Sequence, residues 1–142
     1  MWLLTLALLS SSVFTIHAAG ELKLQARLIW GTDSQKPNDP NLKDLDEKLT
    51  AKLKGVFKWK NYFEVNRQQF SVSEATARRV KMSPKCEVEV QSFGKAGIEV
   101  KLFGEGNLLR KVKQVIPPGE HLVIAGDDKN SNAWFVVITS AQ

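Results

Sequence analysis

Few side chains in this sequence could carry out chemistry together, and a Ser-His-Asp or Cys-His arrangement would have to use a single histidine. Beyond residue 19 the chain has one histidine, His121, and its one cysteine is Cys86. A nucleophile needs a base within hydrogen-bond reach, and no G-x-S-x-G motif accompanies His121. One Cys and one His are also too few for a tetrahedral zinc site. The sequence therefore favours a protein that is not an enzyme and that has no cofactor or metal.

Two groups of acidic or amide side chains leave alternatives open. Glu87 and Glu89 share one face of an alternating segment, although paired glycosidase carboxylates usually come from different elements that meet in a cleft. A second group resembles calcium ligands by composition but lacks EF-hand spacing; it consists of Asp127, Asp128, Asn130 and Asn132. We interpret the first pair as a solvated strand face and the second group as a polar hairpin tip.

Basic and aromatic residues are interleaved in two short stretches. The formal net charge is +5 and the isoelectric point about 9.4, which favours anionic partners such as cell-wall polymers, lipid headgroups or nucleic acid. The competing interpretation places Phe57, Phe63 and Phe70 in the core and the lysines on a solvated surface. The candidate partner contacts are Lys58, Trp59, Lys60, Tyr62, Arg78, Arg79 and Lys81.

A helix followed by strands is expected to position these residues. From about Leu42 to Phe57, leucines recur at intervals of three and four, which predicts an amphipathic helix that covers one face of a sheet. Asn41 could cap this helix. The apolar stripe consists of Leu42, Leu45, Leu49, Leu53, Val56 and Phe57.

Strands are predicted where apolar and polar residues alternate with a period of two. Residues 86–93 and 98–103, joined by the turn 94–97, form the strongest hairpin. A second hairpin, 121–125 with 133–138, has two apolar faces and should be more central. The other predicted strands are residues 22–30, 62–67, 69–73, 78–82 and 108–116.

These elements predict an α+β domain. One N-terminal amphipathic helix would pack on a curved antiparallel sheet, on a partial barrel or on a sandwich of about eight strands. Because short connections join the strands and no βαβ rhythm is present, the sheets should be antiparallel.

The first residues have the features of a secretory signal peptide. An apolar run from Trp2 to Leu9 precedes small residues and an Ala-Ala-Gly junction, which is typical of a cleaved export signal. We therefore expect a signal peptide at residues 1–19 and a single exported domain at 20–142, located in the periplasm or outside the cell. No later apolar segment is long enough to cross a membrane.

The block F-K-W-K-N-Y-F-E-V, residues 57–65, follows directly on the leucine-spaced segment. In this respect the chain resembles small uncharacterised exported bacterial proteins in which a helix leads into an F-x-W-x-x-Y step and a set of strands. The resemblance implies an α+β or β-rich domain of the cell envelope, and it carries over no functional residues.

The sequence thus predicts a non-catalytic exported module that binds another envelope component. The alternative is a binder of anionic polymer or lipid headgroups through the basic and aromatic stretches. A hydrolase that uses Glu87 and Glu89 is a third hypothesis. Export makes nucleic acid an unexpected partner, and the sequence leaves the oligomeric state open.

Overall fold

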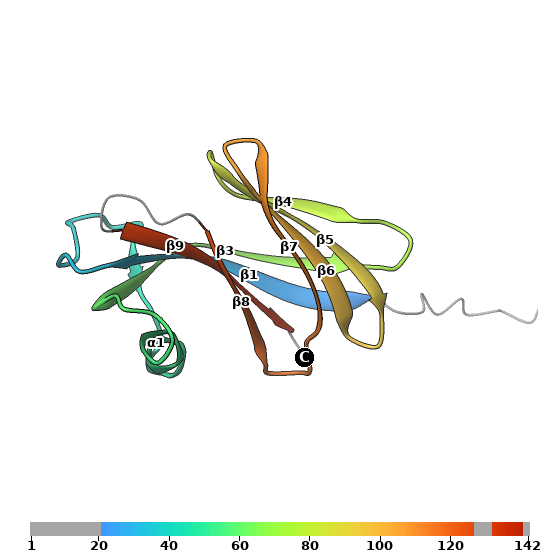
Figure 1. Cartoon of the computed structure of the whole chain (residues 1–142), viewed down its shortest axis with the longest axis horizontal. Coiled ribbons are helices and arrows are strands. Elements are labelled where there is room, and N and C mark those ends of the chain that lie inside the picture. Colours follow the sequence, from blue (N-terminus) through green and yellow to red (C-terminus); the bar gives the residue numbers. More distant parts are fainter. Residues whose placement is uncertain (1–20, 127–131, 141–142) are drawn as a thin grey trace, which may run out of the picture.

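Two antiparallel sheets make up most of the described part of the chain in a computed structural model, which covers residues 21–126 and 132–140 (Figure 1). The expected signal peptide and three of the calcium-like residues, Asp127, Asp128 and Asn130, lie outside the described residues. The five-stranded sheet has the order β2 (Lys43–Asp44), β3 (Asn61–Val72), β1 (Leu22–Thr32), β9 (Asn132–Ser140) and β8 (His121–Ala125). The four-stranded sheet is a meander of β4 (Arg78–Ser83), β5 (Cys86–Gly94), β6 (Gly97–Gly104) and β7 (Asn107–Val115).

The two sheets enclose the larger hydrophobic core. Alternating residues of β5 and β6, such as Val88, Val90 and Val100, are fully buried against the inner face of the five-stranded sheet. Their neighbours in sequence, such as Glu87 and Glu89, point to the other face. This alternation is what the period of two predicts for strands with one buried face.

A second, smaller core lies on the opposite face of the five-stranded sheet, where the helix α1 (Glu47–Lys54) packs (Figure 1). Leu49 and Leu53 of α1 are buried there, together with Phe135 and Val137 of β9. The five-stranded sheet is therefore covered on both faces, and both faces of β9 are apolar, as predicted. Its hairpin partner β8 is an edge strand, so only half of the prediction for that hairpin was right.

The predicted α+β class was wrong, because the described structure is 62% strand and 7% helix, with one short helix and two antiparallel sheets. The helix begins at Glu47 and not near Leu42, since Lys43 and Asp44 pair with β3. Asp46, and not Asn41, caps it by accepting a hydrogen bond from the Leu49 amide at 3.0 Å. Val56, which was assigned to the apolar stripe, is 73% exposed.

The predicted strands 62–67 and 69–73 are one continuous strand, β3. Residues 67–69 pair regularly with β1, and the irregularity of β3 lies earlier: Leu28 is opposite Asn66 and Ile29 opposite Glu64, so Val65 is the extra residue of a β-bulge. The remaining strand predictions were confirmed to within a few residues.

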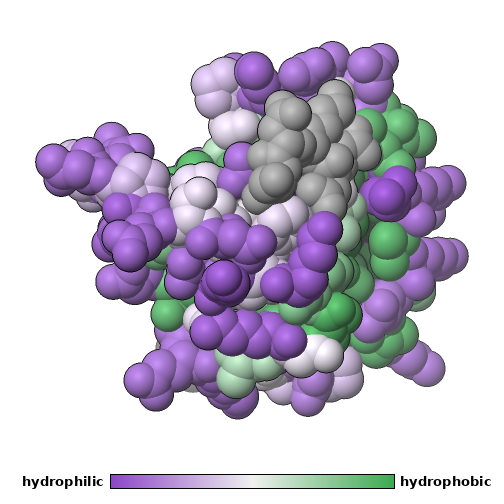
Figure 2. Space-filling model, turned by 60° about the vertical axis from the view of Figure 1, so that its left-hand side comes forward, coloured by the Kyte–Doolittle hydropathy of each residue, from purple (hydrophilic) through white to green (hydrophobic). Residues whose placement is uncertain are grey.

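Hydrophilic side chains cover much of the face in Figure 2, and hydrophobic residues gather toward its right-hand side. In the described part of the chain, no helix has the length and apolar character needed to cross a membrane.

Candidate functional site

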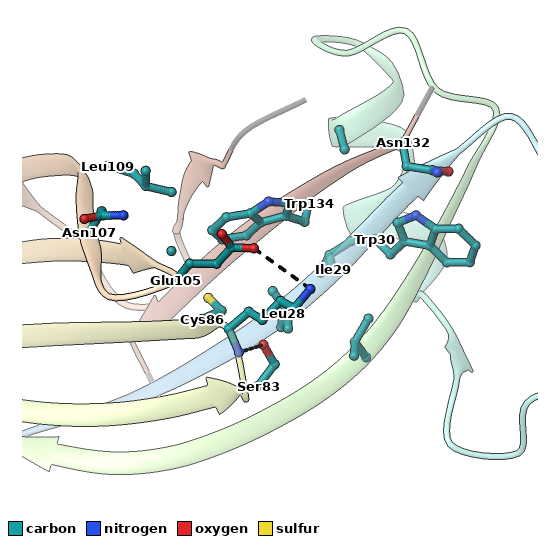
Figure 3. Close-up of a pocket in the computed structure, with 14 residues that line it drawn as sticks. Leu28, Ile29, Trp30, Ser83, Cys86, Glu105, Asn107, Leu109, Asn132 and Trp134 are labelled. Carbon is teal, nitrogen blue, oxygen red and sulfur yellow. Dashed lines mark hydrogen bonds and ion pairs between the residues drawn. The ribbon is translucent and has the colours of Figure 1, made fainter. Parts of the chain in front are cut away.

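A cavity of about 530 Å³ opens between the two sheets at one end of the sandwich (Figure 3). One wall comes from β1, β3 and β9 of the five-stranded sheet. The other wall comes from the β4–β5 and β6–β7 turns. These turns lie at the end where the four-stranded sheet diverges from the five-stranded sheet in Figure 1. The lining residues used below are Leu28, Trp30, Val65, Ser83, Lys85, Cys86, Glu105, Asn107, Leu109, Asn132 and Trp134.

Two tryptophans on neighbouring strands line one wall of the cavity. Trp30 of β1 and Trp134 of β9 lie directly opposite each other in the strand register, and Trp30 also contacts the ring of Phe63 at 5.8 Å between centroids. The indole of Trp134 lies so close to Gly126 that a Cβ there would be 2.3 Å from its Cε2 atom. Any side chain at residue 126 would therefore displace this indole from the wall.

Two β-bulges supply further apolar lining. Val65 is the extra residue of β3, and Leu109 is the extra residue of β7, since Leu102 lies opposite Arg110 and Phe103 opposite Leu108. A bulge turns a side chain away from the direction that regular pleating would give it. Leu109 consequently enters the cavity, whereas its neighbour Leu108 is 53% exposed.

The rim of the cavity is polar. The Lys85 ammonium and the Glu105 carboxylate are 3.9 Å apart, both well exposed, and the Glu105 amide donates a hydrogen bond to the Lys85 carbonyl at 2.8 Å. These two contacts tie the β4–β5 turn to the β6–β7 turn across the opening. An exposed pair of this kind contributes little stability, so its main effect is to place one charge of each sign at the entrance.

Cys86 lies in the wall and is 4% exposed. Burial, with the nearby Glu87 carboxylate as a smaller cause, raises the pKa of its thiol to about 11. The thiol therefore stays protonated at neutral pH and acts as a small apolar group and not as a nucleophile.

The arrangement can hold an apolar group. Cavities of about 300–1,000 Å³ with mostly apolar walls and a few polar groups are typical of small-molecule sites. The apolar walls here are supplied by Leu28, Trp30, Leu109 and Trp134, and the polar groups by the rim. Within residues 21–126 and 132–140, no three His, Cys, Asp or Glu side chains are grouped so that they could hold a metal ion.

The structure does not bring the predicted contact residues together. Trp59 and Tyr62 are 5% and 4% exposed and belong to the small core beneath α1. Lys58 lies over the Trp59 ring at 4.7 Å, and Lys60 is exposed beside it. Phe63 and Phe70 are buried and Phe57 is partly buried, as the competing interpretation has them, and the structure buries Trp59 and Tyr62 as well.

The other predicted cations lie on β4, in the other sheet. Arg78, Arg79 and Lys81 are exposed, and Arg79 donates to the Glu87 carboxylate at 2.7 Å and covers the ring of Phe103. Glu87 is thus half of an ion pair on the outer face of this sheet, with Glu89 opposite Lys101. Contact of these cations with a partner stays a prediction.

The sequence reasoning missed the cavity. Trp30 was assigned to an alternating strand and Trp134 to an apolar one, and Lys85 and Glu105 fell between predicted strands. No local spacing connects these four residues, because only the pairing of β1 with β9 and the stacking of the two sheets bring them together. Alternation for Trp30 and the apolar run for Trp134 marked both side chains as buried, and neither pattern indicated a cavity beside them.

Comparisons of the chain with family models, with curated proteins and with solved structures find no match. The resemblance to small exported bacterial proteins therefore stays a prediction.

Proposed function

We propose that this protein is a non-catalytic, exported binding module that holds an apolar group of another envelope component in the cavity between its sheets. The observation that carries the proposal is the cavity itself, with two tryptophans and the bulged Leu109 in its walls. Export is the sequence-based part of the proposal.

The chemistry of the walls favours a neutral aromatic or aliphatic group. Burial of such a group in an apolar cavity contributes roughly 25 cal/mol per Å², whereas a buried charge without a partner would be costly. Polar parts of the ligand would remain at the rim, where Lys85, Glu105 and Asn107 offer both donors and acceptors.

The neutral fluorescent probe N-phenyl-1-naphthylamine tests the site directly. Adjacent leucines provide a matched pair of variants, because Leu109 lines the cavity and Leu108 is exposed on the outer face of the same strand. We expect saturable binding of one probe per chain to the native protein, at least about tenfold weaker binding to Leu109→Arg, and unchanged binding to Leu108→Arg.

Urea unfolding of both variants checks that they fold. Equal binding by the two folded variants, or no saturable binding to the native protein, would refute the proposal. The envelope partner is tested separately: immobilised native protein should retain from an envelope extract a component that Leu109→Arg loses, and identical recovery by both would count against this cavity as the partner site.

A further inference from the structure

The strand β7 contributes Asn107 and Leu109 to the cavity, and it also offers an unpaired edge of the four-stranded sheet. It pairs with β6 on one side, and the sheet ends there. An unpaired edge presents a row of backbone N–H and C=O groups that can pair with a further strand. β7 has nine residues and contains no proline, and beyond the bulge at Leu109 its residues 110–115 pair regularly with β6 and present a regular free edge.

The other edges of the two sheets are less suitable. β2 has two residues and β8 has five. The remaining edge strand, β4, lies against β3, where the Asn66 side chain donates to the Met82 carbonyl of β4 at 2.9 Å. Among the described strands, β7 therefore combines length with an edge that no other strand covers.

The side chains of β7 indicate the charge of the strand it would accept. The segment contains the cations Arg110, Lys111 and Lys113 and no acidic residue. Glu99 of β6 lies 3.8 Å from Lys111, but Lys101 of β6 lies directly opposite the same lysine. The edge thus keeps an excess of positive charge.

Apolar groups accompany this charge on the outer face of the sheet. Leu108 and Val115, near the two ends of β7, are 53% and 52% exposed, and Phe93 of β5 is 42% exposed. Lys113 lies over the Phe93 ring at 4.3 Å. A strand laid beside β7 would find apolar contacts at its two ends and cations along its middle.

A second copy of the chain is a poor candidate for this position. Two β7 strands side by side would bring cations close to cations, and like charges opposite each other destabilise a strand pair. The same charges that oppose self-association favour a partner of opposite sign.

We propose that the outer edge of β7 accepts an extended acidic segment of a partner protein as a fifth strand of the four-stranded sheet. Backbone hydrogen bonds would supply affinity, as in other strand additions. Specificity would come from carboxylates of the partner that face Lys111 and Lys113, and from apolar side chains of the partner that pack against Leu108 and Val115. This interaction uses the backbone edge and the outer-face side chains of β7, whereas Asn107 and Leu109 of the same strand line the cavity.

The test uses synthetic nine-residue peptides labelled with fluorescein. The first alternates valine and glutamate, the second alternates valine and lysine, and the third has the first sequence with four successive central amides N-methylated. Fluorescence anisotropy should show binding of the first peptide and much weaker binding of the other two. Hydrogen exchange should show protection of the β7 amides by the first peptide.

Two double variants with the same change of charge distinguish binding at β7 from non-specific attraction between an acidic peptide and a basic protein. Lys111→Glu/Lys113→Glu should weaken binding about tenfold or more, and Lys58→Glu/Lys60→Glu should leave it within about twofold. The proposal is refuted if the first peptide does not bind, if the N-methylated peptide binds equally well, if both double variants lose binding equally, or if protection appears outside β7.

Discussion

Arg27 provides the sharpest test of the reasoning about stability, because its guanidinium is charged and almost fully buried. The side chain is 6% exposed and pairs with the Asp46 carboxylate at 2.9 Å, whereas Asp46 itself is 53% exposed. The Nε atom of Arg27 is buried without a hydrogen-bond partner among the described residues. Asp46 also caps α1 through the Leu49 amide at 3.0 Å.

The two roles of Asp46 can be separated by substitution. Asp46→Asn keeps a good capping side chain but removes the charge that faces Arg27, and we expect a loss of about 1–2 kcal/mol in the free energy of unfolding. Asp46→Ala removes the cap as well and should cost about 1 kcal/mol more.

Replacing the buried cation should have the opposite outcome. Arg27→Met removes the desolvation cost and leaves Asp46 in water, so the variant should be within about 1 kcal/mol of the native protein or more stable. In the Arg27→Met background, Asp46→Asn should have almost no effect.

Urea unfolding at pH 7, followed by tryptophan fluorescence, measures all four variants. If Arg27→Met destabilises the protein as much as Asp46→Asn does, or if Asp46→Asn costs the same in both backgrounds, then the buried pair does not act as described.

Three further predictions concern the core, Cys86 and His121. Leu53→Ala should lower the free energy of unfolding by about 2–5 kcal/mol because Leu53 is 1% exposed. Val56→Ala, at a residue 73% exposed, should change it by less than about 0.5 kcal/mol; similar losses for the two variants in urea unfolding would contradict the exposure of Val56. With a pKa raised to about 11, the Cys86 thiol should react with iodoacetamide at pH 8 at least roughly 100-fold more slowly in the folded protein than in urea, and fast labelling of the folded protein would contradict its burial. Burial and the charges of Lys52, Arg27 and Lys48, which outweigh the charge of Asp46, lower the pKa of His121 below 6.5. Below about pH 6.5 the unfolded chain therefore binds a proton that the folded protein does not, so stability should fall as the pH drops. His121→Gln should reduce this loss in urea unfolding measured from pH 7.5 to 5.

The strands were predictable because their signal is local. In residues 86–93 and 98–103 each buried valine or isoleucine alternates with a polar residue, and the turn 94–97 is short, so the hairpin follows from the sequence alone. The class was not predictable in the same way. Leu42 is buried, as the leucine spacing requires, but it lies before the capping residue Asp46 and outside the helix.

The cavity depended on information that no window of sequence contains. Trp30 and Trp134 meet through pairing of strands from the two ends of the described chain. Val65 and Leu109 reach the cavity because one extra residue in each strand shifts the register, and a bulge of this kind has no fixed sequence signature. Trp59 and Tyr62 were predicted as exposed contacts but are buried, because nothing in the local sequence distinguishes an aromatic core residue from an exposed one.

The place of β1 in its sheet has a consequence for the order of assembly. β1 lies between β3 and β9, and Leu24 near its start pairs with Ser140 near the end of β9. During synthesis, β1 therefore cannot pair with β9 until almost the whole described chain has been made. Pairings this distant in sequence slow folding, and such a delay would help a chain that crosses a membrane unfolded.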